Sequence, residues 1–140
     1  MRTGTGARRR GAVAVIPRDG KLLVIRRSIH VPAPRAFCFP GGGVETGETD
    51  AEAAVREVQE ELALPIRAVR PVWRCTSPWK VELVWWLSEA VAGVEPIPNP
   101  AEVESCHWYT VEETLKLENL LSSNRGFLHA VLKGTVSLEL

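Results

Sequence analysis

Residues 42–64 read GGVETGETDAEAAVREVQEELAL, and a helix with well-marked ends can be predicted inside them. Thr49 followed by Glu52 has the spacing of a capping box, so the helix should begin near Asp50. Leu64 precedes Pro65, and the residue before a proline avoids helical dihedral angles, which should stop the helix there. Apolar residues recur at helical spacing and predict one buried stripe: Ala51, Ala54, Val55, Val58 and Leu62.

Three carboxylates should share one face of this helix. Glu57, Glu60 and Glu61 are spaced i, i+3 and i+4, which places their Cβ atoms roughly 5–6 Å apart. A solvated helix face is the ordinary explanation of an acidic run. The spacing also suits a hard divalent cation such as Mg²⁺, which prefers oxygen ligands and is commonly shared with substrate phosphates. Arg56 and Glu48 are close in sequence and could orient a ligand carboxylate.

Upstream of the helix the sequence predicts a hairpin and a glycine turn. Asp19-Gly20 separates two apolar runs, residues 11–16 and 21–27, and this is a strong hairpin signal. Residues 29–35 contain two prolines and should form an irregular loop. Residues 37–40 read as a short strand that leads into three consecutive glycines at 41–43. Glycines allow another group to approach the backbone closely.

Downstream, strands are expected over residues 66–73, 79–87 and 106–110, followed by an amphipathic helix that Gly134 closes. Strands and helices intermix, so the class is α/β or α+β. In the second of these strands, alternate residues should form one apolar face: Trp79, Val81, Leu83, Trp85 and Leu87. Trp73, Trp79 and Trp86 are each expected to be structural rather than surfaces for stacking a base.

Composition excludes several classes of protein. The 140 residues are 45% hydrophobic, enough for one domain with its own core. Seventeen basic and seventeen acidic residues leave no net charge, which argues against a dedicated nucleic-acid binder. No apolar run approaches the roughly 20 residues that span a membrane. The cysteines Cys38, Cys75 and Cys106 lack metal-site spacing and indicate reduced thiols in the cytoplasm. Residues 1–10, with Arg8 to Arg10, should be a flexible basic tail before a domain over 11–140.

The helix and its flanks match a longer pattern, G-x5-E-x7-R-E-U-x-E-E-x-G-U, where U is a bulky aliphatic residue. Eight residues fit it in type and spacing: Gly42, Glu48, Arg56, Glu57, Val58, Glu60, Glu61 and Leu64. The pattern resembles the signature of the Nudix hydrolases, which cleave nucleoside diphosphates linked to another moiety. Phe39-Pro40-Gly41 before it and Trp108-Tyr109 after it also look like the family.

Ala63 departs from the pattern, because the family has glycine at this position. Glycine there supplies a left-handed helix end, a conformation that costs alanine roughly 1–2 kcal/mol. Either Ala63 adopts this strained conformation or the helix continues to Leu64 before Pro65 stops it. Glycine has no side chain, so its replacement removes no catalytic or metal-binding group. The departure therefore affects only the end of the helix.

The resemblance implies a fold and a set of site residues. The fold would be an α/β/α sandwich with a mixed β-sheet between helices. Glu57, Glu60 and Glu61, with the carbonyl of Gly41, would bind Mg²⁺, for which Mn²⁺ could substitute. Glu57, Arg56 and Glu48 would form the catalytic set, with Glu57 as the first candidate for the general base. The remaining candidates fall into two groups, the substrate-binding residues Arg26, Arg27, Arg35, Gly42 and Gly43, and a loop base or extra metal ligand at Glu102 or Glu104.

The activity implied is Mg²⁺-dependent hydrolysis of a diphosphate linkage in a small nucleotide, with no membrane or nucleic-acid partner. A short chain of this type most resembles enzymes that convert a nucleoside triphosphate to monophosphate and pyrophosphate. The alternatives are an ADP-ribose or nucleotide-sugar pyrophosphatase and a non-catalytic nucleotide-binding module. Cys38 does not reproduce the cysteine motif of the isopentenyl diphosphate isomerases, which share the fold. The sequence leaves a homodimer open.

Overall fold

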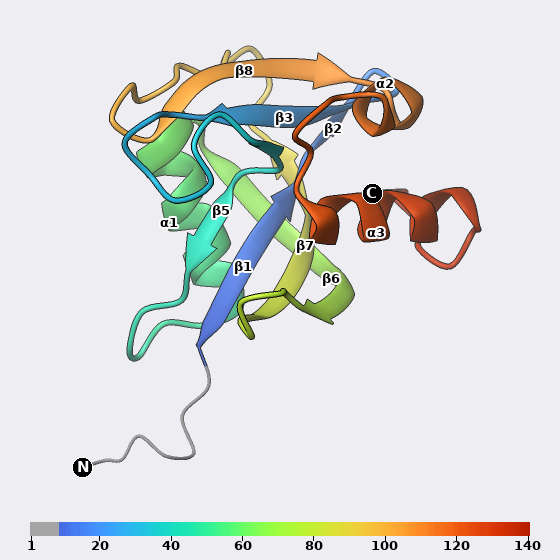
Figure 1. Cartoon of the computed structure of the whole chain (residues 1–140), viewed down its shortest axis with the longest axis horizontal. Coiled ribbons are helices and arrows are strands. Elements are labelled where there is room, and N and C mark those ends of the chain that lie inside the picture. The colour runs from blue at the N-terminus through green and yellow to red at the C-terminus, as the bar shows by residue number, and fades with distance from the viewer. Residues whose placement is uncertain (1–8) are drawn as a thin grey trace.

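Two four-stranded sheets and three helices make up the computed structural model, which describes residues 9–140 (Figure 1). The strands are β1 (Arg10–Val15), β2 (Pro17–Arg18), β3 (Lys21–Arg27), β4 (Phe37–Cys38), β5 (Gly41–Gly43), β6 (Ile66–Thr76), β7 (Glu82–Ala90) and β8 (Val103–Tyr109). The helices are α1 (Asp50–Leu62), α2 (Val111–Leu115) and α3 (Ser122–Leu132). Most of the predicted basic tail, residues 1–8, lies outside the described residues. Arg10 already belongs to β1, where it pairs with Asp50.

The first sheet is mixed and has the strand order β5-β1-β7-β6. β1 runs parallel to β7 and antiparallel to β5, and β6 is antiparallel to β7. In the second sheet β3 pairs with β8 along one edge and with β2 and β4 along the other. This sheet lies across the top of Figure 1. Within residues 9–140 no helix has the length and apolar character that crossing a membrane requires.

Helices cover both faces of the first sheet, so the predicted α/β/α arrangement is confirmed (Figure 1). Alternation along β1 divides the core. Ala12 and Ala14 pack on the α1 side, whereas Val13 and Val15 pack on the α3 side. On the α3 side the rings of Trp85 and Phe127 stack with centroids 4.7 Å apart.

The predicted hairpin forms at Asp19-Gly20. Both residues have positive φ, 51° and 76°, as a two-residue type I′ turn requires. Pro17 and Arg18 of β2 pair with the first residues of β3 across this turn. The local sequence therefore sets the register of the hairpin.

Helix α1 begins and ends where the sequence predicts. Thr49 caps it, because its hydroxyl accepts the Glu52 N–H at 3.1 Å and the Glu52 carboxylate accepts the Thr49 N–H at 2.8 Å. The helix stops at Leu62, and Ala63 adopts the left-handed conformation with φ 49° and ψ 36°. The strained alternative is therefore the one observed. The following residue, Leu64, is fully buried and brings the chain back to the core.

The predicted strand 79–87 begins later than expected. β7 starts at Glu82, and the residues before it form a turn around Ser77. The Ser77 hydroxyl accepts the N–H groups of Trp79 and Val81, both at 3.2 Å. Trp79 is 62% exposed instead of lying on the apolar face of the sheet. The other two strands are longer than predicted, since β6 reaches Thr76 and β8 begins at Val103.

Candidate active site

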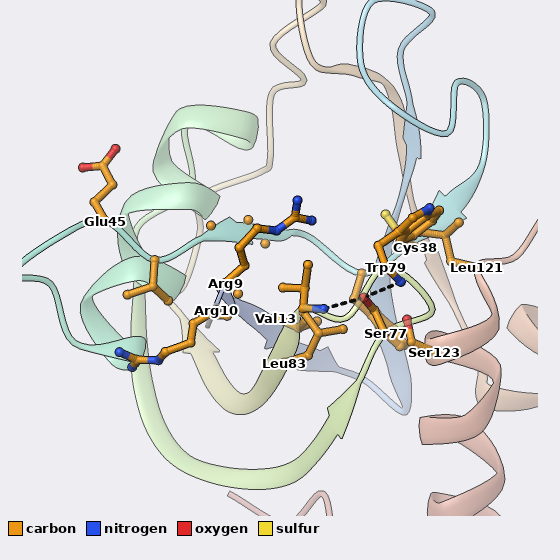
Figure 2. Close-up of a pocket in the computed structure, with 18 of the residues that line it drawn as sticks. Arg9, Arg10, Val13, Cys38, Glu45, Ser77, Trp79, Leu83, Leu121 and Ser123 are labelled. Atoms are coloured by element: carbon orange, nitrogen blue, oxygen red, sulfur yellow. Dashed lines mark hydrogen bonds between the residues drawn. The ribbon is translucent and has the colours of Figure 1, made fainter. Parts of the chain in front are cut away.

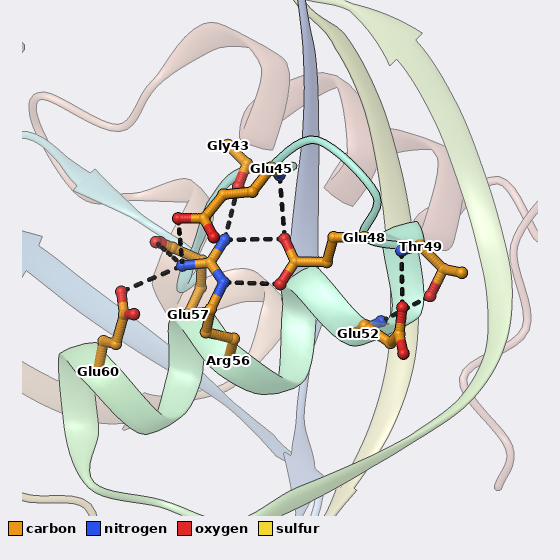
Figure 3. Close-up of polar contacts among 8 residues, drawn as sticks. All are labelled: Gly43, Glu45, Glu48, Thr49, Glu52, Arg56, Glu57 and Glu60. Atoms are coloured by element: carbon orange, nitrogen blue, oxygen red, sulfur yellow. Dashed lines mark hydrogen bonds and ion pairs between the residues drawn. The ribbon is translucent and has the colours of Figure 1, made fainter.

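The guanidinium of Arg56 lies at the centre of a group of carboxylates on α1 and the loop before it (Figure 3). It donates to both oxygens of Glu48, with Nε–Oε2 at 2.7 Å and Nη2–Oε1 at 3.0 Å. Nη2 also donates to the Gly43 carbonyl at 2.8 Å, and Nη1 to Oε1 of Glu60 at 3.2 Å. Oε1 of Glu57 is 3.5 Å from Nη1. Arg56 therefore ties the helix to the glycine strand and orients the carboxylates around it.

Glu57 and Glu61, one helical turn apart, are the buried members of this group, with exposed fractions of 9% and 6%. Burial raises the pKa of Glu57 to about 7, because the loss of hydration outweighs the attraction of Arg56. Burial and then repulsion from Glu57 raise the pKa of Glu61 to about 8. Neutral or poorly compensated carboxyl groups at such depth are typical of functional sites.

Strand β5 is glycine-rich because the glutamates and β1 approach its backbone. The N–H of Gly41 donates to Oε1 of Glu61 at 3.0 Å. A Cβ on Gly42 would lie only 2.2 Å from Oε2 of Glu57. On the other side of the strand, a Cβ on Gly41 would lie 2.2 Å from the carbonyl oxygen of Ala12. Gly41 and Gly42 are therefore required by close contact, as the sequence indicated, whereas a Cβ on Gly43 would meet nothing within 4 Å.

The carboxylate chemistry fits a divalent metal, although it does not form a closed cage. Glu60 is exposed on the surface of α1, and within residues 9–140 no three His, Cys, Asp or Glu side chains converge tightly enough to hold an ion by themselves. Mg²⁺ is usually bound by one or two carboxylates together with waters and substrate phosphates. Glu57 contacts Arg56 and Glu61 accepts from Gly41 through Oε1, which leaves Oε2 of each carboxylate outside these two contacts. Metal ligation by these residues stays a prediction.

The three predicted phosphate-binding arginines are placed differently. Arg27 lines the cavity beside β5, and its charge acts on Glu61. Arg26 instead lies over the ring of Phe37, 4.7 Å from the centroid. Arg35 forms a two-point ion pair with Glu104, at 2.9 and 3.1 Å. The structure therefore leaves Arg27 as the best placed of the three for a phosphate.

The two candidate loop bases, Glu102 and Glu104, also differ in their surroundings. The charge of Glu102 acts on both Glu57 and Glu61 and raises the pKa of each, after the larger effect of burial. Glu104 is held in its ion pair with Arg35, which lowers its pKa. Glu102 is therefore the better placed of the two for proton transfer or metal binding.

A cavity of about 680 Å³ adjoins the glycine strand (Figure 2). Its walls come from β1, β5, the loop after β5, the turn before β7 and the start of α3. Buried Cys38 lies in the wall, and burial raises the pKa of its thiol to about 11 despite the nearby Arg27. The volume is within the range of small-molecule sites.

Sequence reasoning missed parts of this arrangement. Glu45, a further carboxylate beside Arg56, lies 3.8 Å from Nη1 and was hidden in an acidic loop without a motif. Arg9 lines the cavity, although it was expected in the tail. Trp79 lines it as well, and the Ser77-Pro78 dipeptide before Trp79 was the available signal for a turn.

Comparison with known proteins agrees with the predicted signature. Residues 7–131 match the model of the NUDIX domain. The NAD-capped RNA hydrolase NudC of Deinococcus radiodurans is 33% identical over 116 residues, which are 81% of this chain and 40% of that protein. An ADP-ribose pyrophosphatase of Methanocaldococcus jannaschii is 48% identical over 50 residues, 36% of this chain and 29% of that protein. The chain thus spans less than half the length of these curated relatives.

A solved structure supports the fold independently. The MutT protein from Methanosarcina mazei superposes with a TM-score of 0.76 over 89% of this chain and 92% of that chain, at 20% identity. At that identity the likeness concerns the fold alone. It confirms the α/β class and the layered arrangement of sheet and helices.

Proposed function

The chain belongs to the NUDIX family, and on that premise we propose that it hydrolyses a diphosphate linkage in a nucleoside polyphosphate in a Mg²⁺-dependent reaction. Membership supports the predicted enzyme class, hydrolases that act on pyrophosphate bonds. The proposed substrate is a nucleoside triphosphate, cleaved to monophosphate and pyrophosphate. The observation that carries this proposal is the pair of buried carboxylates, Glu57 and Glu61, set against a glycine strand that borders a cavity of nucleotide size.

The metal would be held by Glu57 and Glu61, with Glu60 and the Gly41 carbonyl as further ligands. When bound, Mg²⁺ neutralises diphosphate charge, polarises a phosphoryl oxygen and lowers the pKa of a bound water. Arg56 orients Glu57 and Glu60, and Glu48 in turn holds Arg56 through both of its oxygens.

Substrate contacts would come from β5 and from Arg27 at the end of β3. Gly42 and Gly43 leave the backbone of β5 without side chains where a phosphate would approach, and Arg27 is the one of the three predicted arginines that lines the same cavity. Glu57 is the proposed proton acceptor for the attacking water, because its carboxylate is buried against the glycine strand that the phosphate would approach. Glu102 is the alternative base.

An ADP-ribose substrate is the second candidate. The M. jannaschii ADP-ribose pyrophosphatase shares 48% identity with this chain over 50 residues, a higher figure than the longer NudC match gives. Both substrates contain a diphosphate joined to a nucleoside, so the same carboxylates would serve either. A nucleotide sugar belongs to the same class.

The test is a panel of nucleoside triphosphates, ADP-ribose and a nucleotide sugar, assayed with Mg²⁺ or Mn²⁺. Release of pyrophosphate from a triphosphate supports the first candidate, and release of two monophosphates from ADP-ribose supports the second. Glu61→Gln should abolish turnover without unfolding the protein, whereas Glu118→Gln, the same change at an exposed site outside the cluster, should not. Full activity of Glu61→Gln would contradict the site.

The third alternative is a module that binds nucleotides without cleaving them. In that case the wild-type protein should bind nucleotides but release no product from any substrate of the panel. All signature glutamates are present, which favours the enzyme. The proposed cytoplasmic location rests on the three free cysteines of the described chain, which suit a reducing compartment. Sedimentation analysis would determine whether the chain is a monomer or the homodimer that the sequence left open.

A further inference from the structure

Trp79 is exposed in a way that folding does not explain. Its side chain is 62% exposed, although tryptophan has one of the largest apolar surfaces to bury. It also lines the cavity beside the glycine strand (Figure 2). A large aromatic ring at the wall of a cavity is available to a ligand.

The turn that carries Trp79 is well anchored. Ser77, itself buried, accepts the N–H groups of Trp79 and Val81 through its hydroxyl. The Ser77 N–H donates to the Val81 carbonyl at 2.8 Å, and the Lys80 N–H donates to the Ser77 carbonyl at 2.9 Å. Four hydrogen bonds thus fix the backbone on both sides of the indole. A ring carried on a fixed backbone loses less backbone entropy when it contacts a ligand.

The cavity has two chemically different ends (Figure 2). Charged side chains, Arg10 and Glu45, lie at one side of the view. Trp79, Leu121 and Ser123, which are aromatic, aliphatic and hydroxyl side chains, lie at the other, and Arg9 lies between the two sides. The glycine backbone of β5 borders the same cavity. A molecule with a charged part and a flat, weakly polar part matches this division.

We propose that the face of Trp79 stacks on the nucleobase of the substrate and makes this chain selective for base-bearing diphosphates. This inference rests on the proposed function and adds to it the group that binds the non-phosphate part. Stacking on an aromatic ring accepts any base, because every base has a π-face. Selectivity should therefore be for the presence of a base rather than for its identity.

The experiment compares two non-hydrolysable probes in the presence of Mg²⁺. Adenosine 5′-(α,β-methylene)diphosphate carries a base, and methylenediphosphonate has the same bridged phosphorus pair without base or sugar. Calorimetry would measure both dissociation constants for wild type, Trp79→Ala, Trp79→Phe and a control in the same turn, Lys80→Ala. Thermal unfolding of each variant verifies that it is folded.

Trp79→Ala should weaken binding of the nucleotide analogue about ten-fold and leave methylenediphosphonate unchanged. Trp79→Phe keeps an aromatic face and should stay within about three-fold of wild type. Lys80→Ala should bind both probes as wild type does. For a hydrolysed nucleotide, Trp79→Ala should raise KM and leave kcat within about three-fold, since stacking away from the reacting phosphorus stabilises ground and transition states alike.

Several results would overturn the inference. If Trp79→Ala binds the analogue as tightly as wild type, the exposed indole serves another purpose, such as contact with a protein partner. If it weakens both probes equally, the turn acts on the phosphate site. These two results leave the proposed function standing. If wild type binds neither probe and cleaves no nucleotide, the proposed function fails and the inference fails with it.

Discussion

Glu61→Gln should make the protein harder to unfold at alkaline pH when divalent metal is removed. Glu61 is 6% exposed, and burial and then Glu57 raise its pKa from 4.5 to about 8. At about 1.4 kcal/mol per pH unit, this corresponds to a penalty on the order of 5 kcal/mol for the ionised form. Water entry and local relaxation reduce such penalties, so we expect a gain of about 2 kcal/mol in the variant.

The sign follows from proton linkage. The pKa of Glu61 is higher in the folded than in the unfolded chain, so the folded protein holds the extra proton between pH 4.5 and about 8. The stability contributed by protonated Glu61 is fully present below pH 4.5 and is lost as the pH rises through 8. Glutamine stays neutral, so the difference between variant and wild type should be near zero at pH 4.5 and largest above pH 8.

Urea unfolding in EDTA, followed by tryptophan fluorescence at pH 4.5 and pH 8.5, measures this difference. Glu118→Gln removes a charge from an exposed site and should show no comparable pH-dependent gain. Mg²⁺ at 100 times its dissociation constant should stabilise wild type at pH 8.5 by about 2.7 kcal/mol and Glu61→Gln by much less. An identical pH dependence for wild type and Glu61→Gln would refute the argument that Glu61 is a buried, destabilising charge.

Three further substitutions test local features. Ala63→Gly should raise the free energy of unfolding by about 0.5–1 kcal/mol. Glycine removes the strain of φ 49° at the end of α1, and its greater freedom in the unfolded chain offsets part of this gain. An unchanged thermal unfolding temperature would count against this explanation. Gly42→Ala should lower kcat about 100-fold in a folded protein, since the new Cβ displaces the Glu57 carboxylate, whereas Gly126→Ala has open space and should keep full activity. Arg56→Lys should lower kcat about ten-fold because lysine cannot form the two-point contact, and wild-type rates would contradict this role.

Helix α1 and its chemistry could be predicted because they depend on local spacing. Thr49 and Glu52 cap the helix through contacts three residues apart, and Arg56 reaches Glu60 across one turn. The need for glycine at position 42 also follows from a short motif, although its cause, the approach of Glu57, is visible only in three dimensions.

The rest depends on contacts between distant segments. Arg26 and Arg35 flank the glycine loop equally well in sequence, but Phe37 and Glu104 engage them. Arg27 donates through Nε to the Pro32 carbonyl at 2.6 Å and is the one of the three that lines the cavity. Trp79 fits the pattern in which every second residue from 79 to 87 is apolar. This alternation alone does not distinguish a strand residue from a turn residue. The side-chain hydrogen bonds that hold the turn compete with sheet pairing, so β7 begins only after them.

The buried glutamates link the stability of the fold to its proposed activity. Glu57 and Glu61 repel each other in a setting that disfavours both charges, and a hydrophobic pair of the same size would pack there at lower cost. A divalent cation reverses this balance, because it favours the ionised form of each carboxylate that faces it. The pH range in which the metal-free fold loses stability is therefore the range in which its affinity for a cation rises. The titration of this pair of carboxyl groups would then govern folding, metal binding and catalysis together.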